Sequence, residues 1–75
     1  MDRRGSYAIH PAAPRGRALR LLTTFVLTPR ELSCALDISV YHASLTLRRL
    51  WEQGYCVRWP HRDRSYRYAL KSCYE

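Results

Sequence analysis

The stretch from Ser39 to Gly54 constrains the fold most, because both ends of an amphipathic helix are marked in it. Ser39 is a good N-cap, since its hydroxyl can accept a hydrogen bond from a backbone N–H one turn further on. Gly54 is a good end point, since glycine adopts the left-handed conformation at no steric cost. Between them Ala43, Leu47 and Leu50 recur at helical spacing. The sequence therefore predicts a helix that buries one face.

The opposite face of this predicted helix, with its flanks, is basic and rich in hydrogen-bonding groups. The residues there are Tyr41, His42, Ser44, Leu45, Arg48, Arg49 and Glu52. A helix with one buried side and one side of this kind suits the major groove of DNA, which is wide enough to admit a helix. The competing interpretation is a solvated helix face that makes no contact.

A first helix is predicted over residues 15–27, where Leu19, Leu22 and Val26 share a face. Gly16 weakens the start of this helix, so its boundaries are the least defined of the three.

A second, short helix has a clear start signal at Thr28. Thr28 can cap it, and Glu31 stands three residues later, where it can close a capping box. The helix is expected to reach Leu36 and to bury Leu32, Ala35 and Leu36. A short turn then leads into the central helix, so the two helices form a helix-turn-helix.

After Gly54 the hydrophobic period changes from helical to two, which is typical of strands. Residues 55–59 and 65–70 alternate in this way, and the polar residues 60–64 between them form a hairpin tip. The arginines of this ribbon are Arg58, Arg62, Arg64 and Arg67. The ribbon is therefore basic, with positive charge concentrated at its tip.

These elements predict an α+β domain of three helices followed by a two-stranded β-hairpin, over residues 15–70. Residues 1–14 form a flexible basic arm, and residues 71–75 a short C-terminal tail. Three interpretations of the arm stay open: plain disorder, a minor-groove contact through its arginines, and packing on a second subunit.

The charge of the chain favours an anionic partner. Its 75 residues carry a formal net charge of +7, almost all of it from arginine. Arginine forks match phosphate oxygens and guanine edges with two hydrogen bonds, so nucleic acid is expected ahead of an acidic membrane. The competing interpretation is a basic surface that serves solubility alone.

The remaining composition excludes several classes of protein. The three cysteines, Cys34, Cys56 and Cys73, contain no C-x-x-C pair and cannot form a closed set of disulfides, so a reducing compartment and no metal site are expected. Cys34 and Cys56 are expected in the core. No nucleophile and base stand together, so no enzyme and no cofactor are expected. No apolar run resembles a signal peptide or membrane span, which points to the cytoplasm.

The order of these elements resembles the winged helix-turn-helix superfamily, in the style of MarR-like and related prokaryotic or viral regulators. The resemblance covers residues 19–70. The matching positions are Leu27-Thr28, Glu31-Leu32, Leu36-Asp37-Ile38-Ser39, Leu47, Leu50, Gly54-Tyr55, Val57 and Tyr68-Ala69-Leu70. Ligand-sensing members usually add long dimerisation helices, for which this chain has no room, so small-molecule sensing is not expected.

The resemblance implies two sets of DNA-binding residues. The helix over residues 40–53 would lie in the major groove, and the wing over residues 58–67 on the backbone or minor groove. The groove set is Tyr41, His42, Ser44, Leu45, Arg48 and Arg49, and the wing set is Arg58, Arg62, Arg64 and Arg67.

The expected function is sequence-specific binding of double-stranded DNA by a small transcriptional regulator. One such module contacts few base pairs, so a homodimer on a two-fold site, or side-by-side binding, is expected. Two alternatives stay open. One is a winged-helix module for protein–protein contacts in a larger assembly, because fold does not fix function. The other is an accessory DNA-binding factor in recombination or replication.

Overall fold

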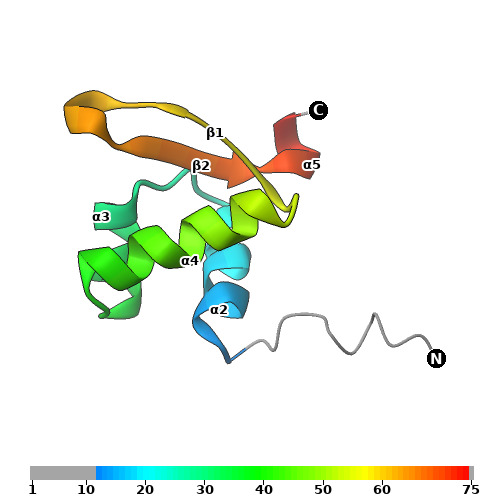
Figure 1. The fold of residues 1–75 in the computed structure, drawn as a ribbon. Coiled ribbons are helices and arrows are strands. Elements are labelled where there is room, and N and C mark those ends of the chain that lie inside the picture. Colours follow the sequence, from blue (N-terminus) through cyan, green and yellow to red (C-terminus); the bar gives the residue numbers. More distant parts are fainter. Residues whose placement is uncertain (1–11, 75) are drawn as a thin grey trace.

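The computed structural model describes residues 12–74 of the chain. Its elements in order are α2 (Pro14–Leu22), α3 (Pro29–Leu36), α4 (Val40–Glu52), β1 (Cys56–Pro60), the 3₁₀ turn η1 (Arg62–Arg64), β2 (Tyr66–Leu70) and α5 (Lys71–Tyr74). The hairpin of β1 and β2 runs along one side of the three longer helices, and its tip extends past the start of α4 (Figure 1). The predicted α+β class, with three helices and a two-stranded hairpin, is confirmed. Most of the predicted N-terminal arm lies outside the described residues.

The first helix ends earlier than its apolar spacing predicts, at Leu22 and not at residue 27. The hydroxyl of Thr23 donates a hydrogen bond to the carbonyl of Arg20 and helps to close the last turn. Leu27 is instead extended, and its backbone exchanges two hydrogen bonds of 3.0 and 2.8 Å with Tyr68 of β2. The prediction was wrong there because Tyr68 of a distant strand provides hydrogen-bond partners for the backbone of Leu27. A helix continued to residue 27 would exclude these bonds.

The start of α3 is the capping box that the sequence predicts. The Thr28 hydroxyl accepts from the backbone N–H of Glu31, and the Glu31 carboxylate accepts from the backbone N–H of Thr28. At the other end Asp37 adopts a left-handed conformation, with φ of 59°. The hydroxyl of Ser33 donates to the carbonyl of Ile38 across this turn. These local bonds set the direction in which α4 leaves α3.

Both predicted ends of α4 are confirmed. The Ser39 hydroxyl accepts a hydrogen bond of 3.0 Å from the backbone N–H of His42. Gly54 follows the helix with φ of +88°, a conformation that L side chains rarely adopt. The turn that leads into β1 therefore depends on a residue without a Cβ.

Replacing Gly54 by alanine should lower the free energy of unfolding by about 1–2 kcal/mol, the usual cost of a non-glycine residue at positive φ. An added Cβ meets no atom within 4 Å, so the cost comes from backbone strain and not from a clash. Chemical denaturation monitored by circular dichroism measures it. Gly54→Asn is the matched control and should lose less, since asparagine tolerates this conformation better. Equal stability of the wild type and Gly54→Ala would contradict the argument.

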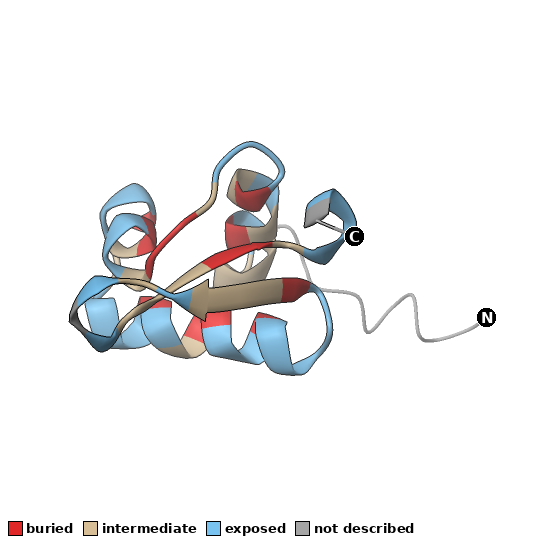
Figure 2. Ribbon diagram, turned by 90° about the horizontal axis from the view of Figure 1, so that it is seen from above, coloured by how far each residue is buried: buried red, intermediate tan, exposed pale blue. Residues whose placement is uncertain are grey.

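The core lies where the helices meet the inner face of the hairpin (Figure 2). Leu32, Leu47 and Leu50 are fully buried at its centre. Cys56 and Tyr68 close it from the hairpin side. The predicted buried face of α4 is confirmed, with Thr46 buried beside its apolar residues.

Two residues predicted to be buried on α3 are exposed: Ala35 and Cys34. An eight-residue helix rests on the core along one stripe, and here Leu32 and Leu36, four residues apart, supply it. Cys56 is buried, as predicted.

The buried Cys56 thiol should be unreactive in the folded protein. Burial raises its pKa from the ordinary 9.0 to about 11, so little thiolate forms at neutral pH. At pH 8 a thiol-specific chromogenic reagent should modify the exposed Cys34 and Cys73 and reach Cys56 only after unfolding in urea. Because the neutral thiol is the form that folding favours, stability should also fall as the pH rises from about 9 to about 11. Rapid reaction of all three thiols would contradict this.

The hairpin is antiparallel, with Cys56 opposite Leu70 and Pro60 opposite Tyr66. The chain that follows β2 forms one helical turn, α5, where the sequence analysis expected only a short tail. The backbone N–H of Lys71 donates to the carbonyl of Tyr55, which ties this turn to the base of the hairpin. No helix in residues 12–74 is long and apolar enough to cross a membrane.

Candidate nucleic-acid interface

A groove of about 790 Å³ lies between α4 and the hairpin and extends to the start of α3. The arginines that line it within the described chain are Arg30, Arg48, Arg58, Arg62 and Arg64. Two acidic side chains line it among the residues whose side chains are described: Glu31 caps α3 and Glu52 pairs with Arg48. A cleft in which one sign of charge predominates concentrates the field that attracts the opposite charge, here an anion.

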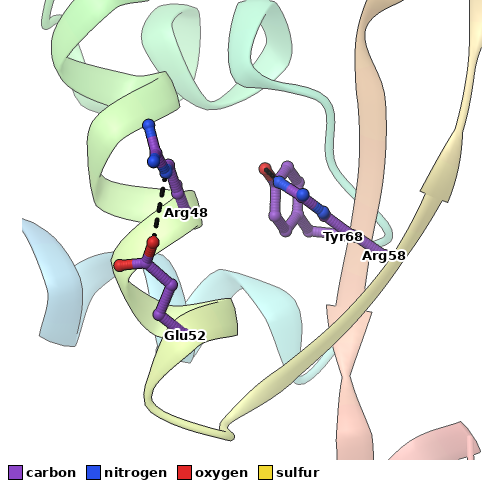
Figure 3. A network of polar contacts seen from close by, with 4 residues as sticks. All are labelled: Arg48, Glu52, Arg58 and Tyr68. Atoms are coloured by element: carbon purple, nitrogen blue, oxygen red, sulfur yellow. Dashed lines mark hydrogen bonds and ion pairs between the residues drawn. The ribbon is translucent and has the colours of Figure 1, made fainter.

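The ion pair on α4 lies along the helix surface at the edge of this groove (Figure 3). Nε of Arg48 and Oε2 of Glu52 are 3.2 Å apart, and both side chains are about half exposed or more, at 62% and 49%. Pairs this exposed contribute little to stability. Glu52 therefore orients the Arg48 side chain through a weak interaction, so Arg48 can exchange this partner for a phosphate or a base edge.

Arg58 of β1 is held by aromatic rings. Its guanidinium carbon lies 3.6 Å from the centre of the Trp51 ring and 4.0 Å from the centre of the Tyr66 ring. Nη1 donates a hydrogen bond of 3.2 Å to the Tyr68 hydroxyl (Figure 3). The side chain is half-buried and therefore less accessible than the exposed Arg62 and Arg64 of the same predicted set.

The tip of the hairpin presents Arg62 and Arg64 to solvent. Its shape is fixed by Ser65, whose backbone N–H and hydroxyl both donate to the carbonyl of Arg62, at 3.1 and 2.7 Å. Arg64 has φ of 62°, a left-handed conformation. With an arginine at this position the conformation lowers the stability of the fold, whereas glycine adopts it freely. The tip thus holds two arginines on a tightly bonded turn.

Arg67 lies on the other face of the hairpin. It stands opposite Trp59 in the register, and side chains alternate along a strand, so it faces away from Arg58 and Tyr66. Arg67 is half-buried, and its Nε is buried without a hydrogen-bond partner among the described residues. The structure therefore separates Arg67 from the other three arginines of the predicted wing set.

The predicted groove set on α4 is spread around an arc of the helix. Ser44 and Arg48 line the groove beside the hairpin. Tyr41, 77% exposed, lies outside it, as do the exposed His42 and Arg49. The last member of the set, Leu45, is half-buried. Because each residue turns the helix by about 100°, these six residues share an arc of about 160°, and only Ser44 and Arg48 at one edge of it face the groove.

Several groove residues were missing from the predicted sets, among them Arg30, Trp51 and Tyr66. Arg30 is the second residue of α3, and the start of α3 lies at the groove. A basic residue in the first turn of α3, two residues after the capping Thr28, was an available signal for it. The aromatic pair had no such signal, since it forms only when α4 and β2 meet. In residues 12–74 no group of three His, Cys, Asp or Glu side chains could hold a metal ion.

A helix-turn-helix followed by a hairpin, with a basic groove between the second helix and the hairpin, defines a winged helix-turn-helix protein. Solved structures share this fold. PefR in its apo, heme-free form superposes with a TM-score of 0.73 at 21% identity, over 93% of this chain and 66% of PefR. Wild-type apo MarR from E. coli superposes with a TM-score of 0.71 at 24% identity, over 92% of this chain and 52% of MarR.

The similarity to a mutant of the same MarR is equal to that of the wild type, with a TM-score of 0.71. The MarR-like winged-helix fold expected from the sequence is therefore confirmed. The chain spans about half to two-thirds of the length of these solved proteins. No protein-family model matches the sequence, and no curated protein matches it significantly.

Proposed function

We propose that this domain binds double-stranded DNA and regulates transcription, with α4 in the major groove and the tip of the hairpin on the adjacent backbone or minor groove. The observation that carries the proposal is the groove between these two elements, which α3, α4 and the hairpin line with arginine, while the two glutamates among its described lining residues have partners. The MarR-like fold supports it, because the helix and the wing stand where such proteins would need them.

The proposed base contacts come from the exposed arc of α4. Tyr41 and His42 stand in its first turn, where groove contacts concentrate in helix-turn-helix proteins. Arg48 and Arg49 extend from the second half of the helix and can reach guanine edges or phosphates. Ser44 adds a hydroxyl between these two groups, and the partly exposed Leu45 is an apolar contact for a thymine methyl group.

The proposed backbone contacts come from Arg62 and Arg64 at the tip and from Arg30 at the start of α3. Arg58 and Arg67 are left out of this set, because the first is stacked between aromatic rings and the second faces away from the groove. One module of this size contacts few base pairs, so we propose that two copies bind a two-fold site.

Fluorescence anisotropy of the protein against a labelled random-sequence duplex, at several salt concentrations, tests the proposal. The logarithm of the affinity should fall with the logarithm of salt concentration with a slope of about −4 to −5 for each copy bound, about 0.9 for each of its proposed arginine contacts. A selection for preferred sequences then tests regulation at a defined site, and binding without preference would favour the accessory factor. No binding at low salt would overturn the proposal in favour of the protein–protein module.

A further inference from the structure

We infer that Arg58 is a positioning residue: it holds the hairpin against α4 and so sets the span between Arg48 on the helix and the arginines at the tip. The DNA-binding consequence rests on the proposed function, whereas the mechanical tie does not. The evidence lies in the contacts of one guanidinium with side chains from two other elements, Trp51 of α4 and Tyr66 and Tyr68 of β2.

Two aromatic rings lie against the Arg58 guanidinium. The centre of the Trp51 ring lies 3.6 Å from its carbon and the centre of the Tyr66 ring 4.0 Å from it. A planar, delocalised guanidinium is weakly hydrated and stacks well on aromatic rings, which the compact ammonium of lysine does not do. The stack therefore joins α4 to β2 through a side chain that belongs to β1.

One edge of the same guanidinium is also bound. Nη1 of Arg58 donates to the Tyr68 hydroxyl at 3.2 Å, and Tyr68 stands opposite Arg58 in the strand register. The backbone of Tyr68 is in turn paired with Leu27, between α2 and α3. The base of the hairpin is thus fixed to the helical layer, and the Tyr66 stack extends the tie two residues further toward the tip.

The position of this tie explains what it can do. β1 leaves the end of α4 and carries the hairpin back along the helix, past the side where Ser44 and Arg48 face the groove (Figure 1). Without the contacts of Arg58, the tip would move relative to α4, because a two-stranded hairpin is only marginally stable on its own. A tip that is already held in place before binding avoids the loss of conformational entropy that a mobile wing would undergo when it contacts DNA.

Arg58→Met tests the tie without DNA, because methionine keeps an apolar stem and removes the charged, flat group. In the wild type, residual dipolar couplings of α4 and of the hairpin amides should fit one common orientation. In Arg58→Met the hairpin couplings should shrink while those of α4 stay. Arg17→Met, the same change on an exposed arginine of α2, is the matched control and should resemble the wild type. A hairpin that keeps its orientation in Arg58→Met overturns the inference.

Arg58→Lys is the second variant, since it keeps the charge and loses the flat surface. It should release the hairpin as Arg58→Met does, and it guards against a methionine variant that fails to fold. Wild-type orientation in the folded Arg58→Lys protein would show that stacking is not what holds the wing, and would overturn the inference.

A thermodynamic cycle on duplex DNA separates positioning from direct contact. If Arg58 acts through the tip, Arg58→Met should flatten the salt slope by about 1.8, as the loss of the two tip contacts does, and should change nothing further in an Arg62→Ala, Arg64→Ala background. If Arg58 itself binds phosphate, the slope should fall by about 0.9 in both backgrounds, which overturns the inference. Absence of wild-type binding would sink the proposed function alone, and the dipolar couplings would then decide on the tie.

Discussion

Reversing the charge of Arg48 and Arg49 together should abolish duplex binding while leaving the fold intact. Both are exposed on α4, and in the proposed complex each contacts a base or a phosphate. Losing one such base contact costs about 1–3 kcal/mol, so the double substitution to glutamate should weaken binding by about a hundredfold or more. Anisotropy against a selected site measures the loss.

The structural cost of this change is small. Arg48→Glu loses an exposed ion pair with Glu52 and creates a like-charge pair one turn apart, which together cost about 0.4–1 kcal/mol. The matched control is the same double reversal at Arg17 and Arg20, which stand exposed on α2 away from the groove. It alters the net charge equally and should keep most of the affinity. Unchanged binding in the Arg48→Glu, Arg49→Glu protein would remove α4 from the interface.

Removing both tip arginines should have the next largest effect, and of a different kind. Arg62→Ala with Arg64→Ala should weaken binding to every duplex by a similar factor and flatten the salt slope by about 1.8, because phosphates carry no sequence information. Alanine and arginine bear the same strain at the positive φ of residue 64, so stability should stay unchanged. A loss confined to some sequences would show that the tip reads bases.

Local signals were enough to predict the ends of α3 and α4. The capping box of Thr28 and Glu31, the N-cap Ser39 and the glycine after α4 act within one helical turn, so a short stretch of sequence contains all that they need. The buried face of α4 was predictable for the same reason, since helical spacing fixes which residues share a side.

What the sequence did not reveal depends on contacts between distant segments. Residues 23–27 match a helical pattern in the sequence. In the structure the backbone of Leu27 pairs with Tyr68, and that pairing exists only once the hairpin is in place. The stack of Arg58 on Trp51 and Tyr66 needs both the strand register and the packing of β2 along α4. The basic residues of the candidate site could therefore be found in the sequence, but not which of them face one groove.

The left-handed backbone at Arg64 sets two requirements against each other at one position, because stability favours glycine there and the proposed DNA contact favours arginine. A population screened only for thermal resistance should accumulate glycine at position 64, because glycine relieves the strain there. A population screened for occupancy of a DNA site should keep the arginine and accept a slightly less stable protein. The residue that each screen enriches at position 64 would then show whether stability or DNA binding dominates at the tip of the wing.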